Sequence, residues 1–227
     1  MKNRILSLAL ILVLLLVCGC QRQPANNNSD TEELCNYEVT HEPFEDMEII
    51  NSYADYLTCD SEDELFKTSE MVFIGMPTET FTDGKEILYN FNGEEIPKGS
   101  DDKIFNFVTV RNVKVLKMLK GDNSLKEIKV AEEAMQQTDL NGVVRIIGLP
   151  DYASIAKKNV KYLYYVDKAA QKNMDFYVIN PDRGLVNIDG LDSKTNNKVG
   201  NTRLNEAKTR FAAEFDKYDR SSELAAK

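Results

Sequence analysis

Histidine and tryptophan are scarce in this chain, which contains one histidine, His41, and no tryptophan. A single imidazole excludes any metal site that needs two histidines, and the stretch from His41 to Glu45 lacks the second histidine of a zincin helix. The sequence also has no Gly-x-Ser-x-Gly elbow, no phosphate-cradling glycine-rich loop and no Cys-x-x-Cys. We therefore expect no enzymatic activity, no cofactor and no metal, and we interpret His41 as an exposed loop histidine.

Basic side chains are also in short supply, with 28 Lys and Arg against 37 Asp and Glu and a formal net charge of −9. Removal of residues 1–19 takes away Lys2 and Arg4 and leaves 26 basic against 37 acidic side chains, or −11. Nucleic acids and anionic lipid surfaces are bound through basic faces. The composition therefore argues against a nucleic-acid partner and against adhesion of the folded body to anionic lipid. Acidic runs such as residues 60–64 and 182–192 lack the EF-hand pattern, so we expect solvated turns there.

Only one long apolar run is present, from Ile5 to Val17, and it follows the basic residues Lys2 and Arg4. The run is too short to span a hydrocarbon core and has the layout of a signal peptide. No second apolar run long enough to cross a bilayer follows it, so everything from Gln21 onward is expected outside the cell membrane. An ordinary secretory signal cleaved elsewhere, or a short uncleaved anchor, is the alternative.

The end of this segment, Val17-Cys18-Gly19-Cys20, resembles the bacterial lipobox, with an aliphatic residue three places before a cysteine and a small residue directly before it. The resemblance implies a signal peptide over residues 1–19, a lipid such as palmitate on Cys20, and tethering to the outer, extracytoplasmic face of the cell membrane. Cys18 is a poorer lipid acceptor because Val17 precedes it. Acylation at Cys20 would give stable attachment through at least two chains.

Residues 20–33 hold the lipidated cysteine and a polar stretch without periodicity, which predicts a flexible spacer. A single β-rich extracytoplasmic domain is expected over residues 34–220, followed by a frayed tail over residues 221–227. Cys35 and Cys59 are the two thiols left in the mature chain, and outside the cell such a pair suggests a disulfide. Two unbonded thiols, or a zinc site with His41, are the alternatives.

Apolar patterning predicts strands over residues 71–76, 104–119, 126–131, 143–148, 162–167 and 176–180, with a turn at Asn141-Gly142. Ser61 and Glu64 form a capping box, so a helix is expected over residues 62–69. Within the longest strand the valines change phase between Val110 and Val113, which predicts a β-bulge or sharp coil near Arg111 and Asn112.

A final helix should begin near Thr202, with Glu206 and Arg210 forming an i,i+4 pair on its outer face. Its apolar stripe is more typical of a core-packing surface than of a partner groove. The stripe consists of Leu204, Ala207, Phe211, Phe215 and Tyr218.

The order of these elements resembles extracytoplasmic Gram-positive proteins with an OB-type barrel, similar to netrin-like and metalloproteinase-inhibitor domains. The likeness covers residues 61–180 and rests on residues 69–75, on the Val-Leu-Lys-Met-Leu-Lys-Gly stretch over residues 115–121, on residues 128–130 and on residues 161–166. It implies a mainly β, OB-like antiparallel barrel with a short helix before the first strand and a C-terminal amphipathic helix. The inhibitors chelate zinc through a free N-terminal cysteine, a mechanism closed to a lipidated Cys20.

The connection between the strands at 71–76 and 104–119 is far longer than a hairpin loop and contains Phe81, Tyr89 and Phe91. Long ordered loops are commonly functional, so we expect a protruding hairpin whose aromatic residues contact a protein or glycan partner in the cell envelope. The alternative is that these rings cover an open barrel end. The sequence as a whole predicts a binding protein. A lipoprotein that captures a small solute for a transporter, or an unrecognised enzyme, is the alternative.

Overall fold

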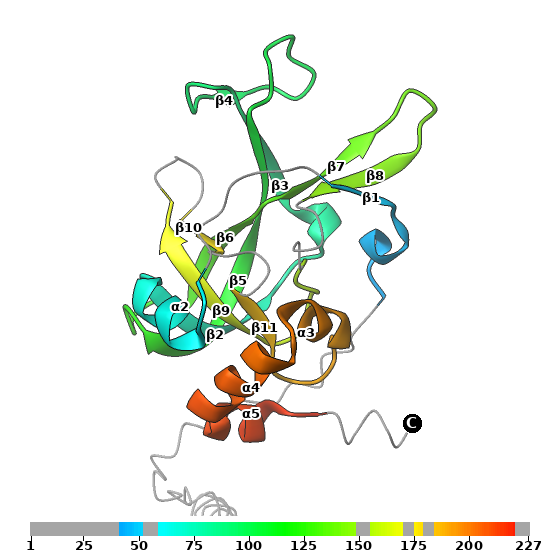
Figure 1. Cartoon of the computed structure of the whole chain (residues 1–227). Helices are drawn as coiled ribbons and strands as arrows, with labels where there is room; N and C mark the ends of the chain where they lie inside the picture. Colours follow the sequence, from blue (N-terminus) through cyan, green and yellow to red (C-terminus); the bar gives the residue numbers. More distant parts are fainter. Residues whose placement is uncertain (1–40, 52–58, 149–154, 170–174, 179–183, 221–227) are drawn as a thin grey trace, which may run out of the picture. The chain divides into compact units, whose positions relative to one another are not determined.

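Residues 41–51, 59–148, 155–169, 175–178 and 184–220 are described by the computed structural model of this chain (Figure 1). The predicted signal peptide, the spacer with Cys20, Cys35 and the C-terminal tail lie outside the described residues. None of the described helices combines the length and the apolar character needed to cross a bilayer.

A closed five-stranded barrel forms the centre of the fold and confirms the mainly β prediction. Its strands close the ring in the order β2, β5, β6, β10, β9 and back to β2. All pairs are antiparallel except β6 and β10, which run parallel, and the arrangement is consistent with an OB-like barrel. The bounds are β2 (Met71–Pro77), β5 (Asn106–Lys120), β6 (Glu127–Glu132), β9 (Tyr162–Lys168) and β10 (Phe176–Val178).

Strand β2 is the central strand that its unbroken apolar run predicts, because every residue from Met71 to Pro77 is buried. It pairs with β5 along one edge and with β9 along the other. Inside the barrel, the ring of Phe73 stacks on the ring of Tyr164 with centroids 4.9 Å apart. Gly75 makes close packing possible, since a Cβ there would lie 2.7 Å from a methyl of Val113.

The bulge predicted near Arg111 and Asn112 in β5 is wrong. Pairing of β5 with β6 is regular from Thr109 to Lys114, and the register shifts lie opposite β2, at Val72/Phe73 and Ile74/Gly75. The prediction assumed that polar Arg111 faces solvent, whereas Arg111 is buried on the same side of the strand as Val113. Both faces of β5 are covered between Val110 and Val113, so valines on opposite faces are both buried and no inserted residue is needed.

Two insertions extend from the barrel (Figure 1). The first is the predicted hairpin, made of β3 (Lys85–Tyr89) and β4 (Glu95–Ile96), which follows the 3-10 helix η2 (Phe81–Asp83) and pairs with the first part of β5. The second, which we call the small sheet, has the order β1, β8, β7. Its strands are β1 (Ile49–Asn51), β7 (Ala134–Thr138) and β8 (Val144–Gly148), and the 3-10 helix η1 (Pro43–Asp46) precedes β1.

The four described α-helices are α2 (Glu62–Thr68), α3 (Ser193–Val199), α4 (Asn201–Arg210) and α5 (Ala212–Tyr218), with β11 (Leu185–Asn187) paired to β9. The predicted capping of α2 is half right. The Ser61 hydroxyl accepts from the amide of Glu64, but the Glu64 carboxylate accepts from the amide of Asp60 rather than from that of Ser61.

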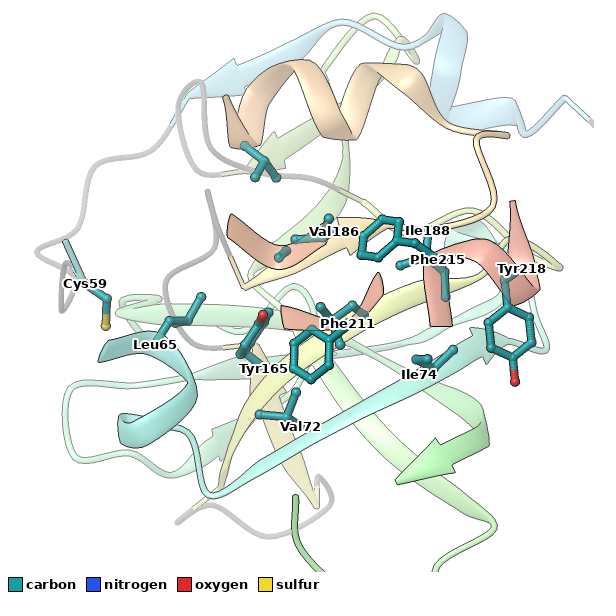
Figure 2. Packing of buried hydrophobic residues seen from close by; sticks show 13 residues of the cluster. Cys59, Leu65, Val72, Ile74, Tyr165, Val186, Ile188, Phe211, Phe215 and Tyr218 are labelled. Atoms are coloured by element: carbon teal, nitrogen blue, oxygen red, sulfur yellow. The ribbon is translucent and has the colours of Figure 1, made fainter. Parts of the chain in front are cut away.

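The final helix is split at Phe211, so α4 and α5 replace the single helix predicted from its stripe. The stripe packs into the core as expected, and Figure 2 shows Phe211 and Phe215 against residues of β2, β9 and β11. Each fully buried ring of this size contributes about 1.5–3 kcal/mol. The predicted Glu206 to Arg210 pair is wrong, because Arg210 instead reaches Glu62 and Asp63 across the gap to α2.

Candidate functional site

Exposed large hydrophobic side chains gather on the two insertions, and in the described ranges none lies on the barrel or the helices. This clustering makes the two insertions candidates for an interaction surface, because exposed apolar residues scattered singly would need no explanation. On the β3–β4 insertion they are Phe91, Ile104 and Phe105, and on the small sheet and its turn they are Ile49, Ile50, Leu140, Val143 and Val144.

Phe91 and Phe105 form an aromatic pair at the surface of the β3–β4 insertion. Phe91 is 80% exposed and Phe105 is 65% exposed, yet their ring centroids are only 5.0 Å apart at an edge-to-face angle of 75°. Phe91 lies in the turn between β3 and β4, and Phe105 lies directly before β5. Two rings that bind each other in water present one joint apolar surface to a partner.

Hydrogen bonds to the Asn90 side chain fix the turn that carries Phe91. The Asn90 side-chain oxygen accepts from the amides of Asn92 and Glu94 at 2.9 and 3.0 Å, which is the Asx-type bonding that stabilises tight turns. Gly93 adopts a φ of 75°, which glycine tolerates and other residues rarely adopt. On the other side of the pair, the amide of Phe105 donates to the carbonyl of Tyr89 at 2.8 Å. The pair is therefore held on an ordered turn.

The structure separates the three aromatic residues that the sequence placed in one partner-binding group. Phe91 is exposed, and its contact with a partner stays a prediction. Phe81 and Tyr89 are both buried, so the prediction that they contact a partner is wrong. Phe81 packs edge-to-face on Phe44, while Tyr89 belongs to the cluster with Ile87 and Val108, and burial raises the pKa of its hydroxyl.

The base of the β3–β4 insertion is fixed by a buried ion pair inside the barrel. Arg111 Nε donates to Glu132 Oε2 at 2.7 Å, and the other carboxylate oxygen accepts from the amide of Ala156 at 2.9 Å. Burial alone lowers the pKa of Arg111, but the charge of Glu132 and its other neighbours raise it above the ordinary value, so the guanidinium stays charged. Burial raises the pKa of Glu132, against the effect of Arg111 and the Ala156 amide, and the bonded geometry supports an ionised pair.

The same guanidinium reaches both chain segments that cross this end of the barrel. Arg111 donates to the carbonyl of Glu79 at 3.3 Å and to that of Ala156 at 2.6 Å, and the Glu79 carboxylate accepts from the amide of Asn112 at 2.7 Å. Gly84 lies so close to β5 that an added Cβ would be 2.8 Å from the Cγ of Arg111. The segment leading into the insertion is thus anchored to the barrel wall.

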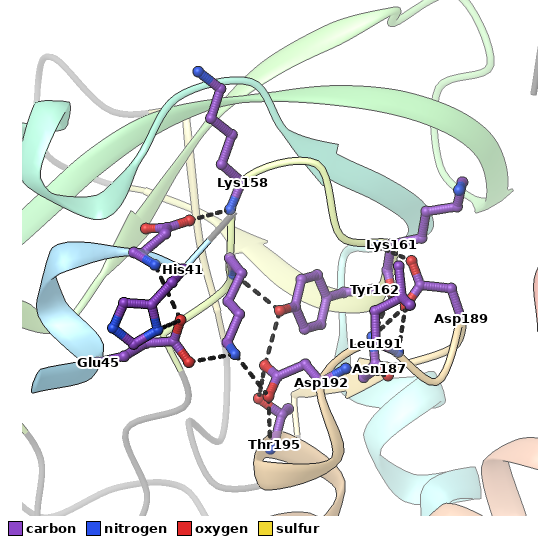
Figure 3. A network of polar contacts seen from close by, with 12 residues as sticks. His41, Glu45, Lys158, Lys161, Tyr162, Asn187, Asp189, Leu191, Asp192 and Thr195 are labelled. Carbon is purple, nitrogen blue, oxygen red and sulfur yellow. Dashed lines mark hydrogen bonds and ion pairs between the residues drawn. The ribbon is translucent and has the colours of Figure 1, made fainter. Parts of the chain in front are cut away.

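The one histidine lies at the rim of a polar network that ties the first described segment to the barrel (Figure 3). His41 is exposed and contacts Glu45 and Asp46, while Glu45 pairs with Lys157. Deeper in, the Asp192 carboxylate accepts from the Tyr162 hydroxyl at 2.9 Å. Burial, followed by the charge of Asp192, raises the pKa of Tyr162 well above its usual value, so this phenol stays protonated. The network suits a structural role rather than acid-base chemistry.

Two acidic residues expected in solvated turns are buried instead. Asp189 and Asp192 lie in the loop between β11 and α3, where Asp189 accepts from the amide of Lys161 at 2.8 Å and from the Asn187 side chain at 2.8 Å. Burial raises the pKa of Asp189. Asp192 accepts from the hydroxyl and the amide of Thr195 and caps α3. These carboxylates are satisfied by protein donors, as buried charges require.

Neither a metal site nor the disulfide is established by the described part of the chain. No cluster of three or more His, Cys, Asp or Glu side chains that could hold a metal ion occurs there. Cys59 is buried in the core beside Leu65, whereas Cys35 lies outside the described residues. The disulfide between the two cysteines stays a prediction.

A surface groove of about 740 Å³ runs between α2 and α4. Polar and charged side chains line it: Ser61, Glu62, Asp63, Thr202, Asn205, Glu206, Thr209 and Arg210. Its charges are largely paired, since Arg210 bridges Glu62 and Asp63 and Arg203 lies 3.3 Å from Glu206. The volume is within the range of small-molecule sites, and the lining side chains offer hydroxyl, amide and carboxylate groups.

No protein-family model matches this chain, and no curated protein matches it. The candidate site is therefore argued from the positions of its residues alone. Two of these residues, Ile104 and Phe105, are not singled out by the sequence pattern. The sequence pattern predicts that Ile104 and Phe105 begin the strand over residues 104–119, yet both precede β5 and are exposed. The preceding run of Gly99, Ser100, Asp101 and Asp102 was a usable signal, because strands seldom begin directly after such polar turn residues.

Proposed function

We propose that this protein is a lipid-anchored extracytoplasmic binding protein that contacts a protein or glycan partner in the cell envelope through Phe91 and Phe105. The observation that carries the proposal is the exposure of these two rings, 80% and 65%, on an ordered turn. Leaving such area in water stabilises nothing in the isolated protein. Its placement is understandable if a partner covers it.

The expected contribution of the pair to binding is substantial. Covering a phenylalanine side chain contributes about 1.5–3 kcal/mol, and buried aromatic anchors dominate the energetics of many interfaces. The Asn90 turn and the edge-to-face contact hold the rings in place before a partner arrives, which reduces the entropy lost on binding.

The anchor rests on the lipobox resemblance at Cys20 and is tested by metabolic labelling with radioactive palmitate. Cys20→Ala should carry no label and should retain its signal peptide, because the cysteine sulfur is the lipid acceptor and acylation precedes cleavage. Cys18→Ala is the matched control and should be labelled and processed like the wild type. Label that persists in Cys20→Ala and disappears from Cys18→Ala would show that the anchor was assigned to the wrong cysteine.

Capture of a small polar solute for delivery to a transporter is the second candidate function, favoured by the groove between α2 and α4. A ligand there would be held by hydroxyl, amide and carboxylate groups. A thermal-shift screen with small polar solutes tests this candidate. A rise in melting temperature that is lost in Asn205→Leu would favour capture over partner binding through the β3–β4 insertion.

A further inference from the structure

The small sheet carries an apolar surface of its own, which the proposed partner site does not include. Leu140 is fully exposed at the turn between β7 and β8, and Val143 and Val144 follow it. Ile50 of the edge strand β1 is also exposed, but it is aligned with Ile147 on the other face of the sheet and does not extend the surface of the turn. Both faces of the sheet are packed near the barrel, since Ile146 is buried with Phe44 and Phe81, and Ile147 packs on Leu88 and Ile96 of the β3–β4 insertion. The free apolar surface is therefore at the β7–β8 turn.

The turn that presents Leu140 is rigid. Asp139 Oδ1 accepts from the amides of Asn141 and Val143 at 2.8 and 2.9 Å, and Gly142 takes a φ of 81°. Arg145 then ties the Asp139 carboxylate to Glu48, which precedes β1, through an Nε to Oε2 bond of 2.7 Å to Glu48. These hydrogen bonds fix the backbone of the turn and keep the Leu140 side chain exposed to solvent rather than packed against the sheet.

Charge distinguishes this surface from the aromatic one. The β7–β8 hairpin, residues 134–148, contains two charged side chains, Asp139 and Arg145, which form an ion pair, so the net charge of the hairpin is zero. Residues 85–105, which include the aromatic pair, instead contain five acidic and three basic side chains and carry a net charge of −2. An apolar surface with little net charge can approach an apolar medium at low desolvation cost.

The position of the small sheet in the chain brings a bilayer within reach. The chain enters the described fold at His41, and β1 follows η1 directly. Residues 21–40 separate His41 from Cys20 and, fully extended, could span at most about 70 Å. A domain tethered over such a distance meets the membrane at an effective concentration of order millimolar, so that weak contacts become populated.

We propose that the β7–β8 turn docks on the lipid bilayer that holds the anchor, with Leu140 and Val143 entering the interfacial region of the leaflet. The inference rests on the proposed lipid anchor at Cys20 and adds the orientation of the domain: the small sheet faces the membrane. The aromatic pair on the other insertion stays free for its partner. The net charge of −11 expected for the mature chain opposes approach to anionic lipid, so zwitterionic lipid is the preferred surface.

The absence of tryptophan makes a direct test possible, because Leu140→Trp gives a single-tryptophan protein. The mature lipidated chain is purified, its acylation is confirmed by mass, and it is reconstituted into phosphatidylcholine vesicles. Tryptophan fluorescence is then measured with and without brominated lipid, which quenches only residues within the bilayer. Phe91→Trp is the matched control, since it also places a tryptophan at an exposed turn, and both variants should melt like the wild type.

The expected result is a blue-shifted, bromine-quenched emission for Leu140→Trp and an unshifted, unquenched emission for Phe91→Trp. Adding phosphatidylglycerol at low salt should weaken the quenching, and added salt should restore it by screening. An unquenched Leu140→Trp in protein of confirmed acylation overturns the inference and leaves the anchor standing. Quenching of both variants overturns the assigned orientation. A blue shift that depends on protein concentration and occurs without vesicles would show instead that the β7–β8 turn contacts a second copy of the chain. If the mass shows no lipid, the proposed anchor itself has failed.

Discussion

Arg111 and Glu132 form an ion pair within the closed barrel, with 2.7 Å between Arg111 Nε and Glu132 Oε2 and side chains only 1% and 8% exposed. The pair joins neighbouring strands β5 and β6, and through Glu79 and Ala156 it also holds the segments that cross the barrel end. Its removal therefore affects both the barrel and the base of the β3–β4 insertion.

Arg111→Met should destabilise the fold by about 3–5 kcal/mol, because it leaves the Glu132 carboxylate buried without its cation. The double variant Arg111→Met/Glu132→Leu should recover much of that loss, since no charge is left unpaired. Urea unfolding followed by circular dichroism measures both. Lys67→Met, which breaks the exposed pair with Asp63, is the control and should cost less than about 1 kcal/mol. Equal losses for Arg111→Met and Lys67→Met would contradict this account of the barrel centre.

Lys120 at the end of β5 caps the C-terminus of α2. Its ammonium donates to the carbonyls of Phe66 at 2.7 Å, Lys67 at 2.9 Å and Ser69, and lies 5.3 Å from the centre of the Phe66 ring. Lys120→Met should cost about 1–3 kcal/mol, because the carbonyls lose a charged donor that also offsets the helix dipole. The readout is the urea midpoint. Lys114→Met removes the same charge from an exposed position of the same strand and should change stability by no more than about 0.5 kcal/mol. Indistinguishable midpoints for the two variants would show that Lys120 is not a cap.

His41 should titrate above its ordinary value of 6.5, because a hydrogen bond to Asp46 and the charge of that carboxylate favour the imidazolium. Because the pKa of His41 is raised in the folded state, protonation of His41 stabilises the fold. This stabilisation is fully present at a pH below the unfolded-state pKa and is lost as the pH rises through the folded-state pKa. The chain has one histidine, so proton NMR of untagged protein follows a single imidazole signal. Asp46→Asn should move the pKa down toward 6.5. A pKa at or below 6.5 in the wild type would refute the contact.

The pattern of apolar residues predicted most of the barrel strands. It did not predict strand β7 or the buried position of Arg111. Residues 71–76 are apolar on both faces, and only a central strand between two neighbours satisfies such a run. Strand β7 was missed because its sequence, Ala-Met-Gln-Gln-Thr, has few strand-favouring residues, and tertiary pairing with β8 overrides that weak propensity. The bulge prediction failed at Arg111, since sequence alone does not reveal that Glu132 provides a buried partner.

The hairpin that carries the candidate site was predicted correctly, whereas its role in partner binding stays a prediction. The long connection after β2 does form a hairpin, and Phe91 is exposed on it. Phe81 is drawn into the core by contacts with Phe44 and Arg111, and Tyr89 by β5, which no local pattern encodes. Helix α3, absent from the sequence prediction, depends on capping by Asp192, which had been assigned to a solvated turn.

The central claim, that the aromatic pair is the partner-binding surface, is tested by measuring partner binding with Phe91→Ser/Phe105→Ser. Both rings are exposed, so the melting temperature should stay that of the wild type. Leu140→Ser is the matched control, because it removes an exposed apolar side chain from the other insertion. Proteins and glycans recovered with the wild type from detergent-solubilised cell envelope are identified, and their affinity for each variant is determined.

The account predicts that the double variant binds the wild-type partner about a hundredfold or more weakly, as expected from two anchors of about 1.5–3 kcal/mol each, while Leu140→Ser binds normally. Recovery of the same partner at the same affinity by a stably folded Phe91→Ser/Phe105→Ser variant would contradict it.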